Sequence, residues 1–172
     1  EQAAAFIADA YGRLTGKAGV CLGTLGPGAT NLITGVADAN MDRAPLVCIT
    51  GQADTRRMHK ESHQAMDVVG MFRPVTKWAQ SVFHPENIPE IVRKAFKVAQ
   101  TEKPGATFID FPENIAEMQV DGKPIEVQTA YTSTTPEAKL EQAAKIISKA
   151  KFPIILAGNG VIRQGASDSL TS

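Results

Sequence analysis

Apolar and polar residues alternate along the chain with the periods of helices and of buried strands. Three stretches of the first hundred residues carry apolar residues at the three- and four-residue spacing of an amphipathic helix: 2–14, 29–40 and 87–100. Four short apolar runs are typical of strands: 19–22, 45–50, 75–82 and 106–111. This repeated order of strand, loop and helix predicts an α/β domain with a largely parallel sheet.

The hydrophobic pattern weakens in two places. Residues 53–73 carry many charged and polar side chains before an apolar group, and they predict a loop or short helix near a site. Residues 119–136 replace hydrophobic periodicity with Asp, Gly, Lys, Pro, Thr and Ser, which is typical of an interdomain linker. We therefore expect one domain over 1–118, a linker over 119–136, and the truncated start of a central α/β domain over 137–172.

The second domain is predicted from one helix and one strand. Residues 136–150 have helical spacing, and the apolar run 153–157 predicts a strand that leads into a Gly-Asn-Gly loop. The chain begins with Glu1 already inside a helical pattern and stops soon after this strand. The sequence is therefore interpreted as an internal piece of a longer protein.

Composition and charge narrow the classes of function. Of the 172 residues, 43% are hydrophobic, and 18 Lys and Arg balance 18 Asp and Glu, so neither a disordered chain nor a basic nucleic-acid-binding protein is expected. No apolar run approaches the ~18 residues of a membrane span. Cys21 and Cys48 lie in apolar runs without a disulfide or metal-ligand spacing, which favours reduced core cysteines in a cytoplasmic protein. A small uncharged or singly charged ligand matches this composition best.

The loop 23–28 is the first candidate for chemistry. It follows a strand and precedes a helix, where backbone N–H groups can hold a polar or anionic ligand. Its glycine spacing matches neither the dinucleotide fingerprint nor the P-loop, so turn geometry is the commoner explanation for such glycines.

Glu1 can be a first-turn acid that interacts with the helix dipole. His63 and Gln64 lie in the polar loop, where a single His is most often a surface residue.

Several ordered motifs, taken together, resemble one family. They are Glu1-Gln2-Ala3-Ala4, Ala10-Tyr11-Gly12-Arg13, Gly26-Pro27-Gly28-Ala29-Thr30-Asn31, Ala37-Asp38-Ala39 and Ile49-Thr50-Gly51-Gln52. At this spacing they resemble the pyrimidine-binding domain of thiamine-diphosphate-dependent enzymes, and they are most similar to acetolactate (acetohydroxyacid) synthases. The resemblance covers most of 1–118 and continues through 153–165. It implies the three-layer, parallel-sheet thiamine-diphosphate fold, followed by the start of a Rossmann-like α/β domain.

The resemblance gives Glu1 a catalytic role. Thiamine diphosphate is activated when a carboxyl group hydrogen-bonds ring atom N1′ of its aminopyrimidine and favours the imino tautomer, and Glu1 stands at the position of that glutamate. Five further residues match the loop and helix start that lie against the aminopyrimidine: Thr24, Gly26, Pro27, Gly28 and Asn31. Gln64 matches a glutamine that lines the substrate channel, and His63 lies beside it.

Three departures from the family pattern concern a second cofactor, FAD. The flavin-containing biosynthetic synthases usually carry Phe, Arg and Lys where this sequence has His63, Lys103 and Glu113. The stretches 62–64 and 71–77 look more like the flavin-independent catabolic acetolactate synthases. The resemblance therefore does not lead us to expect bound FAD.

The implied reaction is decarboxylation of pyruvate and its carboligation to a second 2-keto acid, which gives 2-acetolactate. In this family a separate C-terminal domain of the partner subunit holds the diphosphate and Mg²⁺, through motifs absent from these residues. We therefore expect no metal ligand in this chain, a homodimer or homotetramer, and no activity in the isolated fragment. Two alternatives stay open: another thiamine-diphosphate enzyme of 2-keto acids, such as a pyruvate oxidase, a decarboxylase or another carboligase, and a catalytically silent α/β binding module.

Overall fold

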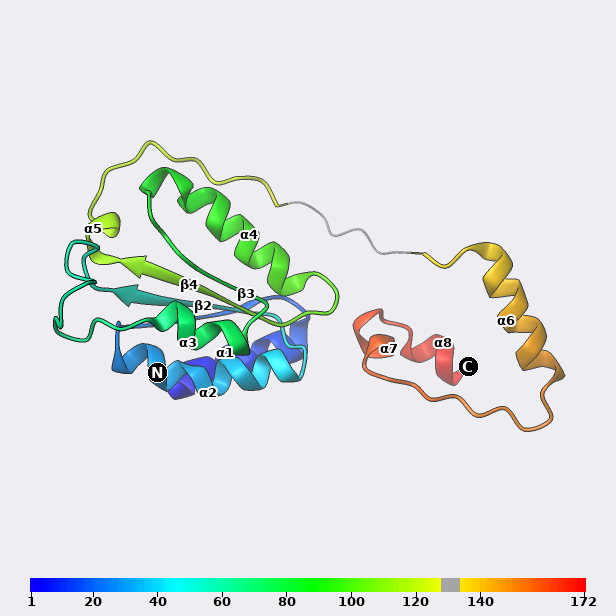
Figure 1. Ribbon diagram of the computed structural model, residues 1–172. Helices are drawn as coiled ribbons and strands as arrows, with labels where there is room; N and C mark the ends of the chain where they lie inside the picture. The colour runs from blue at the N-terminus through cyan, green and yellow to red at the C-terminus, as the bar shows by residue number, and fades with distance from the viewer. Residues whose placement is uncertain (128–133) are drawn as a thin grey trace. The chain divides into compact units, whose positions relative to one another are not determined.

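The computed structural model describes residues 1–127 and 134–172 (Figure 1). The chain forms two compact units whose boundary falls within 128–133, and each unit is described by itself. The predicted linker over 119–136 includes 128–133, which lie outside the described residues. The assignment of domains therefore stays a prediction.

A four-stranded parallel sheet forms the centre of the first unit. In spatial order its strands are β1 (Gly19–Gly23), β2 (Leu46–Gln52), β4 (Ala106–Pro112) and β3 (Trp78–Ser81). A central strand of such a sheet is covered on both faces, and every residue of β4 is buried except the half-buried Phe111. The structure confirms the predicted α/β fold with a largely parallel sheet.

Helices lie on both faces of this sheet (Figure 1). One face carries α1 (Gln2–Thr15), α2 (Pro27–Met41) and α3 (Val68–Phe72), and the opposite face carries α4 (Ile88–Gln100). Three short elements complete the unit: η1 (Arg73–Val75), η2 (Pro85–Asn87) and α5 (Glu113–Ala116). No helix in the described part of the chain is long and apolar enough to cross a membrane.

The two hydrophobic layers follow from the alternation of side chains along each strand. Cys48 and Phe108 pack with α1, α2 and α3, whereas Val47 and Ile109 pack with α4. Phe108 stacks on Phe72 of α3, with ring centroids 3.8 Å apart and ring planes 7° apart. This stack holds α3, the short helix predicted within 53–73, against the sheet.

The second unit contains three helices in its described residues: α6 (Glu137–Lys149), α7 (Gly160–Arg163) and α8 (Ser167–Thr171). Helix α6 confirms the helix predicted over 136–150. The strand predicted over 153–157 is wrong, because this segment is irregular and Ile154 and Leu156 are 95% and 99% exposed. A strand needs a neighbouring strand for its backbone hydrogen bonds, and the described residues of this unit contain no such neighbour.

Candidate functional site

Two helices of the first unit are held in a register that brings Glu1 beside Asn31. Helices α1 and α2 approach closely at Gly35, where an added Cβ would lie 2.6 Å from Cβ of Ala5. One turn earlier on both helices, Nδ2 of Asn31 donates a hydrogen bond to Oε2 of Glu1 at 3.3 Å. Each partner is displaced by four residues, about one helical turn. The contact of the two small residues therefore sets the position of the polar pair.

The carboxylate of Glu1 is available to a ligand. Glu1 occupies the N-cap position of α1, where its backbone oxygen accepts a hydrogen bond from the N–H of Ala5 at 3.1 Å. Its side chain makes no capping hydrogen bond, and the residue is exposed. Oε1 accepts no hydrogen bond within the described residues. The acid therefore has one oxygen oriented by an amide and one oxygen free.

The turn from β1 into α2 lies directly against this carboxylate. A Cβ added to Gly28 would lie 2.6 Å from Cγ2 of Thr24 and 3.4 Å from Oε1 of Glu1. The backbone N–H groups of Gly28 and Thr30 donate to oxygens within the turn, at 3.3 Å to Leu25 and 3.1 Å to Gly26. These donors are already used, so the glycines serve close approach rather than anion binding. The geometry of the turn therefore places Gly28 and Thr24 next to the Glu1 carboxylate.

Gln64 reaches the same turn from a distant part of the chain. Gly26 has a φ of +58°, and a Cβ added to it would lie 2.7 Å from Cβ of Gln64 and 2.8 Å from its backbone oxygen. Gln64 itself has a φ of +59°, in the left-handed region that few residues other than Gly adopt. The loop 53–67 therefore packs its strained residue against the glycine turn.

The structure assembles most of the predicted site residues around this turn. Thr24 and Glu1 meet at Gly28, and Asn31 is hydrogen-bonded to Glu1. Pro27 begins α2, and Gln64 contacts the same turn at Gly26. His63 is exposed and makes no hydrogen bond with the described residues. The contacts thus bring most of the candidate residues together and leave His63 outside them, and the role of each residue stays a prediction.

The chain also matches known proteins. Residues 1–71 match the family model of the thiamine pyrophosphate enzyme N-terminal TPP binding domain. The probable acetolactate synthase large subunit of Methanococcus aeolicus is 44% identical over 177 aligned residues, which cover 99% of this chain and 30% of the relative. The chain is homologous to acetolactate synthase large subunits. The acetolactate synthase large subunit of Corynebacterium glutamicum is 39% identical, with 99% of this chain and 28% of the relative covered.

The chain covers only part of the length of its relatives. The acetolactate synthase isozyme 1 large subunit of Escherichia coli is 38% identical, with 96% of this chain and 30% of the relative covered. The chain thus spans about 30% of the length of these acetolactate synthase subunits. The resemblance seen in the motifs is confirmed, and the first unit contains a thiamine pyrophosphate enzyme N-terminal domain. The matched segment includes every predicted site residue from Glu1 to Gln64, although the role of each stays a prediction.

A row of buried polar side chains in this acetolactate synthase homologue was not predicted from the sequence. Thr50, Asp110 and Ser81 lie in register on the adjacent strands β2, β4 and β3. Oγ of Ser81 donates a hydrogen bond to Oδ2 of Asp110 at 2.5 Å. Oδ1 of Asp110 and Oγ1 of Thr50 are buried without a partner in the described structure.

Asp110 is the electrostatically unusual member of this row. It is 1% exposed, and this burial raises the pKa of its carboxyl to about 6. The hydrogen bond from Ser81 and the nearby side-chain amide of Gln52 lower the pKa, and the charge of Asp67 raises it further. The sequence carried one signal for this group, an acidic residue inside the apolar run 106–111, since charged residues are seldom buried without a partner.

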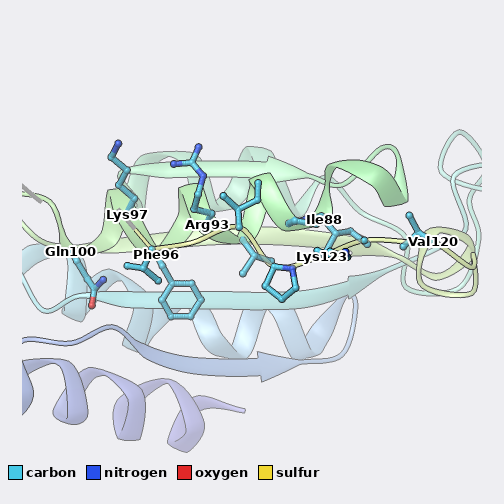
Figure 2. A pocket seen from close by; sticks show the side chains of 13 residues that line it. Ile88, Arg93, Phe96, Lys97, Gln100, Val120 and Lys123 are labelled. Carbon is cyan, nitrogen blue, oxygen red and sulfur yellow. The ribbon is translucent and has the colours of Figure 1, made fainter. Parts of the chain in front are cut away.

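A separate apolar cavity of about 640 Å³ lies between α4 and the segment 120–127 (Figure 2). Ile88 and Phe96 of α4 line it on one side, and Val120 lies on the other. The charged side chains of Arg93 and Lys97 stand at its edge. None of the predicted site residues lines this cavity, so it contributes nothing to the grouping around Glu1.

Proposed function

We propose that the protein containing this chain is a thiamine-diphosphate-dependent acetolactate synthase. It would decarboxylate pyruvate and join the remaining two-carbon unit to a second 2-keto acid to give 2-acetolactate. The observation that carries the proposal is the free carboxylate oxygen of Glu1, next to Asn31 and Gly28, in a chain homologous to acetolactate synthase large subunits. The free, buried thiols of Cys21 and Cys48 support a reducing, cytoplasmic location.

The residues around Glu1 fit the aminopyrimidine half of thiamine diphosphate. A ring nitrogen that shares a proton needs a carboxylate with an unoccupied oxygen, and Oε1 of Glu1 is such an atom. The missing Cβ of Gly28 keeps the face beside this oxygen open to a flat ring. When bound, thiamine diphosphate supplies a thiazolium carbon that can store the electron pair left by decarboxylation of a 2-keto acid.

Each residue of the group then has a defined task. Glu1 would hold the proton at its carboxyl and share it with N1′ of the cofactor ring. Asn31 would keep the carboxyl in one orientation through its hydrogen bond to Oε2. Gln64, packed on Gly26, would position the substrate, and His63 would lie at the edge of the same channel.

The remaining parts of the active centre would come from outside this chain. We propose that another domain of a partner subunit binds Mg²⁺ and the diphosphate, so that the active enzyme is a homodimer or homotetramer with pyruvate as its substrate. FAD is not part of the proposal, because His63, Lys103 and Glu113 depart from the flavin-containing pattern.

The test compares the intact protein with its Glu1→Gln variant in the presence of thiamine diphosphate and Mg²⁺. Acetolactate formation from pyruvate is measured, and the exposed Glu86→Gln serves as a control with the same loss of charge. We expect Glu1→Gln to lower kcat by about two orders of magnitude or more, as removal of a proton-transferring group does. Glu86→Gln should leave the rate within twofold of wild type.

Two other outcomes would replace this proposal. Pyruvate consumption with release of acetaldehyde or acetate would indicate a decarboxylase or oxidase on the same cofactor. The absence of any thiamine-dependent turnover in the intact protein would favour a silent α/β binding module, in which Glu1 only begins a helix.

A further inference from the structure

The loop that carries Gln64 is closed at its base by one side chain. Gln52 is the last residue of β2 and is 3% exposed. Its Nε2 donates a hydrogen bond to the backbone oxygen of Met66 at 3.0 Å, and its Oε1 accepts one from the N–H of Ala53 at 2.9 Å. Because both ends of the segment 53–66 bind the same side-chain amide, this segment is an Ω-loop whose ends are held together.

A second pair of hydrogen bonds attaches the start of this loop to α5, which directly follows β4. Oδ1 of Asn114 accepts a hydrogen bond from the N–H of Thr55 at 3.0 Å, and Nδ2 of Asn114 donates one to Oγ1 of Thr55 at 2.9 Å. Arg57 also pairs with Glu113 at 3.0 Å, but both side chains are more than half exposed, and such pairs contribute little. Asn114 is therefore the main attachment at this end.

The other end of the loop is held through α3. Oδ1 of Asp67 accepts a hydrogen bond from the N–H of Gly70 at 2.8 Å and so caps this helix. The backbone oxygen of Met66 accepts a second hydrogen bond, from the N–H of Val68 at 2.9 Å. Gln64 lies two residues before Met66, so it belongs to a segment that is fixed on both sides.

The position of Gln64 depends on these attachments. Its side chain makes no hydrogen bond with the described residues, so nothing else at its own position holds it. Its φ of +59° is an uncommon conformation that persists only where the surroundings impose it. A loop released at either end would therefore let Gln64 move away from Gly26.

We propose that Gln52 and Asn114 are positioning residues, which hold the loop 53–66 so that Gln64 stays against Gly26 and meets the substrate. Neither has to touch the substrate or thiamine diphosphate in this role. The inference rests on the proposed function only for the task of Gln64. It also accounts for the glutamine that ends the motif 49–52.

Two substitutions remove these hydrogen bonds with little change in side-chain size: Gln52→Met and Asn114→Leu. Methionine is chosen because Gln52 and the buried Asp110 line a cavity of about 270 Å³, which a smaller side chain would enlarge. The same changes at exposed positions, Gln119→Met and Asn87→Leu, are the matched controls.

The first measurement is hydrogen exchange of residues 53–67 in the intact protein without substrate, followed by mass spectrometry. We expect Gln52→Met and Asn114→Leu to speed exchange at least tenfold, since local opening exposes backbone amides, while the controls stay within twofold of wild type. Asn114→Asp should also stay within twofold, because a carboxylate can accept from both the N–H and the hydroxyl of Thr55. Unchanged exchange in both loop variants would overturn the inference, whatever reaction the protein catalyses.

The second measurement is the kinetics of acetolactate formation from pyruvate. We expect Gln52→Met to raise KM for pyruvate about tenfold, while kcat and the Kd for thiamine diphosphate change less than threefold. In a Gln64→Ala background the same substitution should raise KM less than twofold further, because effects of residues that act through one another are not additive. A full tenfold rise in that background would overturn the inference.

Failure of this inference is distinguishable from failure of the proposed function. A wild-type protein that forms no acetolactate contradicts the proposed function, and the exchange of residues 53–67 still decides whether Gln52 and Asn114 hold the loop. Normal acetolactate formation, with exchange and KM unchanged in both variants, contradicts the inference alone.

Discussion

At the scale of single residues, the candidate site depends on two glycines that lack a Cβ as well as on the polar side chains around them. Gly28 has no Cβ, and this lets Thr24 and Glu1 approach the first turn of α2. Gly26 has a positive φ and no Cβ, and this lets Gln64 pack on the same turn. Elsewhere in the unit, Asp110 is an ionisable residue in a buried position. An apolar side chain could be buried there at a lower cost in free energy.

Gly28→Ala should weaken binding of thiamine diphosphate. The new Cβ would lie 2.6 Å from Cγ2 of Thr24, so the turn must move and disturb the space beside Glu1. We expect about a tenfold rise in Kd for thiamine diphosphate with Mg²⁺, measured by calorimetry on the intact protein, equivalent to about 1.4 kcal/mol.

Thr24→Ser provides the matched rescue, since serine lacks Cγ2. The double variant Gly28→Ala with Thr24→Ser should recover part of the lost affinity, and Thr24→Ser alone should behave as wild type. An equal loss of affinity in the single and double variants would show that the Thr24 contact is not what excludes a side chain at position 28.

Asp110→Asn should remove a pH dependence of the free energy of unfolding. Burial raises the pKa of this carboxyl from 3.8 to about 6, so the folded protein holds the proton more tightly than the unfolded chain. The stability associated with Asp110 is therefore fully present below about pH 4 and is lost as the pH rises from about 4 through 6. The difference between the folded and unfolded pKa values of Asp110 corresponds to at most about 3 kcal/mol in the free energy of unfolding.

The measurement is the difference in free energy of unfolding between Asp110→Asn and wild type, from urea titrations at pH 4.5 to 8. This difference should shift in favour of the variant as the pH rises, because the neutral amide never has to be buried as a charge. The exposed Asp121→Asn should show no such trend. A difference that is constant with pH would mean that Asp110 does not change its ionisation in this range.

At the scale of elements, the α1–α2 pair connects packing to the site. Gly35 against Ala5 brings the helices together, and Asn31 and Glu1 meet one turn away. Arg13 adds a second link near the other end of α1, where it pairs with the buried Asp9 at 2.9 Å and with Asp38 of α2 at 2.9 Å. The Gly35–Ala5 contact sets the distance between the two helices, and the Asn31–Glu1 and Arg13–Asp38 pairs fix their register.

Gly35→Ala tests this coupling between helix packing and the polar pair. The added Cβ would lie 2.6 Å from Cβ of Ala5, and such overpacking costs about 1–3 kcal/mol of stability. We expect lower unfolding midpoints and a lower rate of acetolactate formation, because α1 and α2 must separate where Glu1 and Asn31 meet. Thr34→Ala, at an exposed position of the same helix, should change neither.

The double variant Gly35→Ala with Ala5→Gly returns the missing space to the other helix. It should recover the rate more fully than the stability, since glycine inside a helix costs about 1 kcal/mol. A normal rate in Gly35→Ala itself would show that the register of α1 and α2 does not control the position of Glu1.

At the scale of the whole molecule, the first unit has a layered core and a defined group of polar residues. The described residues of the second unit form three helices and an exposed apolar segment. In that segment Ile154 and Leu156 are almost fully exposed. The chain spans about 30% of the length of its acetolactate synthase relatives. Under the proposed function, the diphosphate and Mg²⁺ are held by a domain beyond these residues.

The 172-residue chain by itself should therefore form no acetolactate from pyruvate with thiamine diphosphate and Mg²⁺. The intact protein under the same conditions is the positive control, and product is measured as acetoin after acid treatment. Turnover by the isolated chain above the buffer rate would contradict the proposal that another domain completes the active centre.

Much of the fold and part of the site could be predicted from the sequence. Hydrophobic periodicity located the four strands and the long helices of the first unit, because the buried face of a helix or strand repeats with a fixed period. The ordered motifs located the family and the residues of the group around Glu1, and the structure brings Glu1, Gly28 and Asn31 together. Hydrophobic periodicity and sequence motifs can be read from short segments of chain, so neither requires knowledge of tertiary contacts.

Other features were decided only by the tertiary structure. The apolar run 153–157 has a strand pattern but forms no strand in the described structure, because a strand requires hydrogen bonds from a neighbour. The cavity at Asp110 joins β2, β3, β4 and the loop before α3, and no single segment predicts that one carboxylate oxygen would be left unpaired. The sequence by itself determined the family and the elements of the first unit, because both depend on short local patterns. Contacts between distant segments determined whether an apolar run forms a strand and which buried polar atoms have partners.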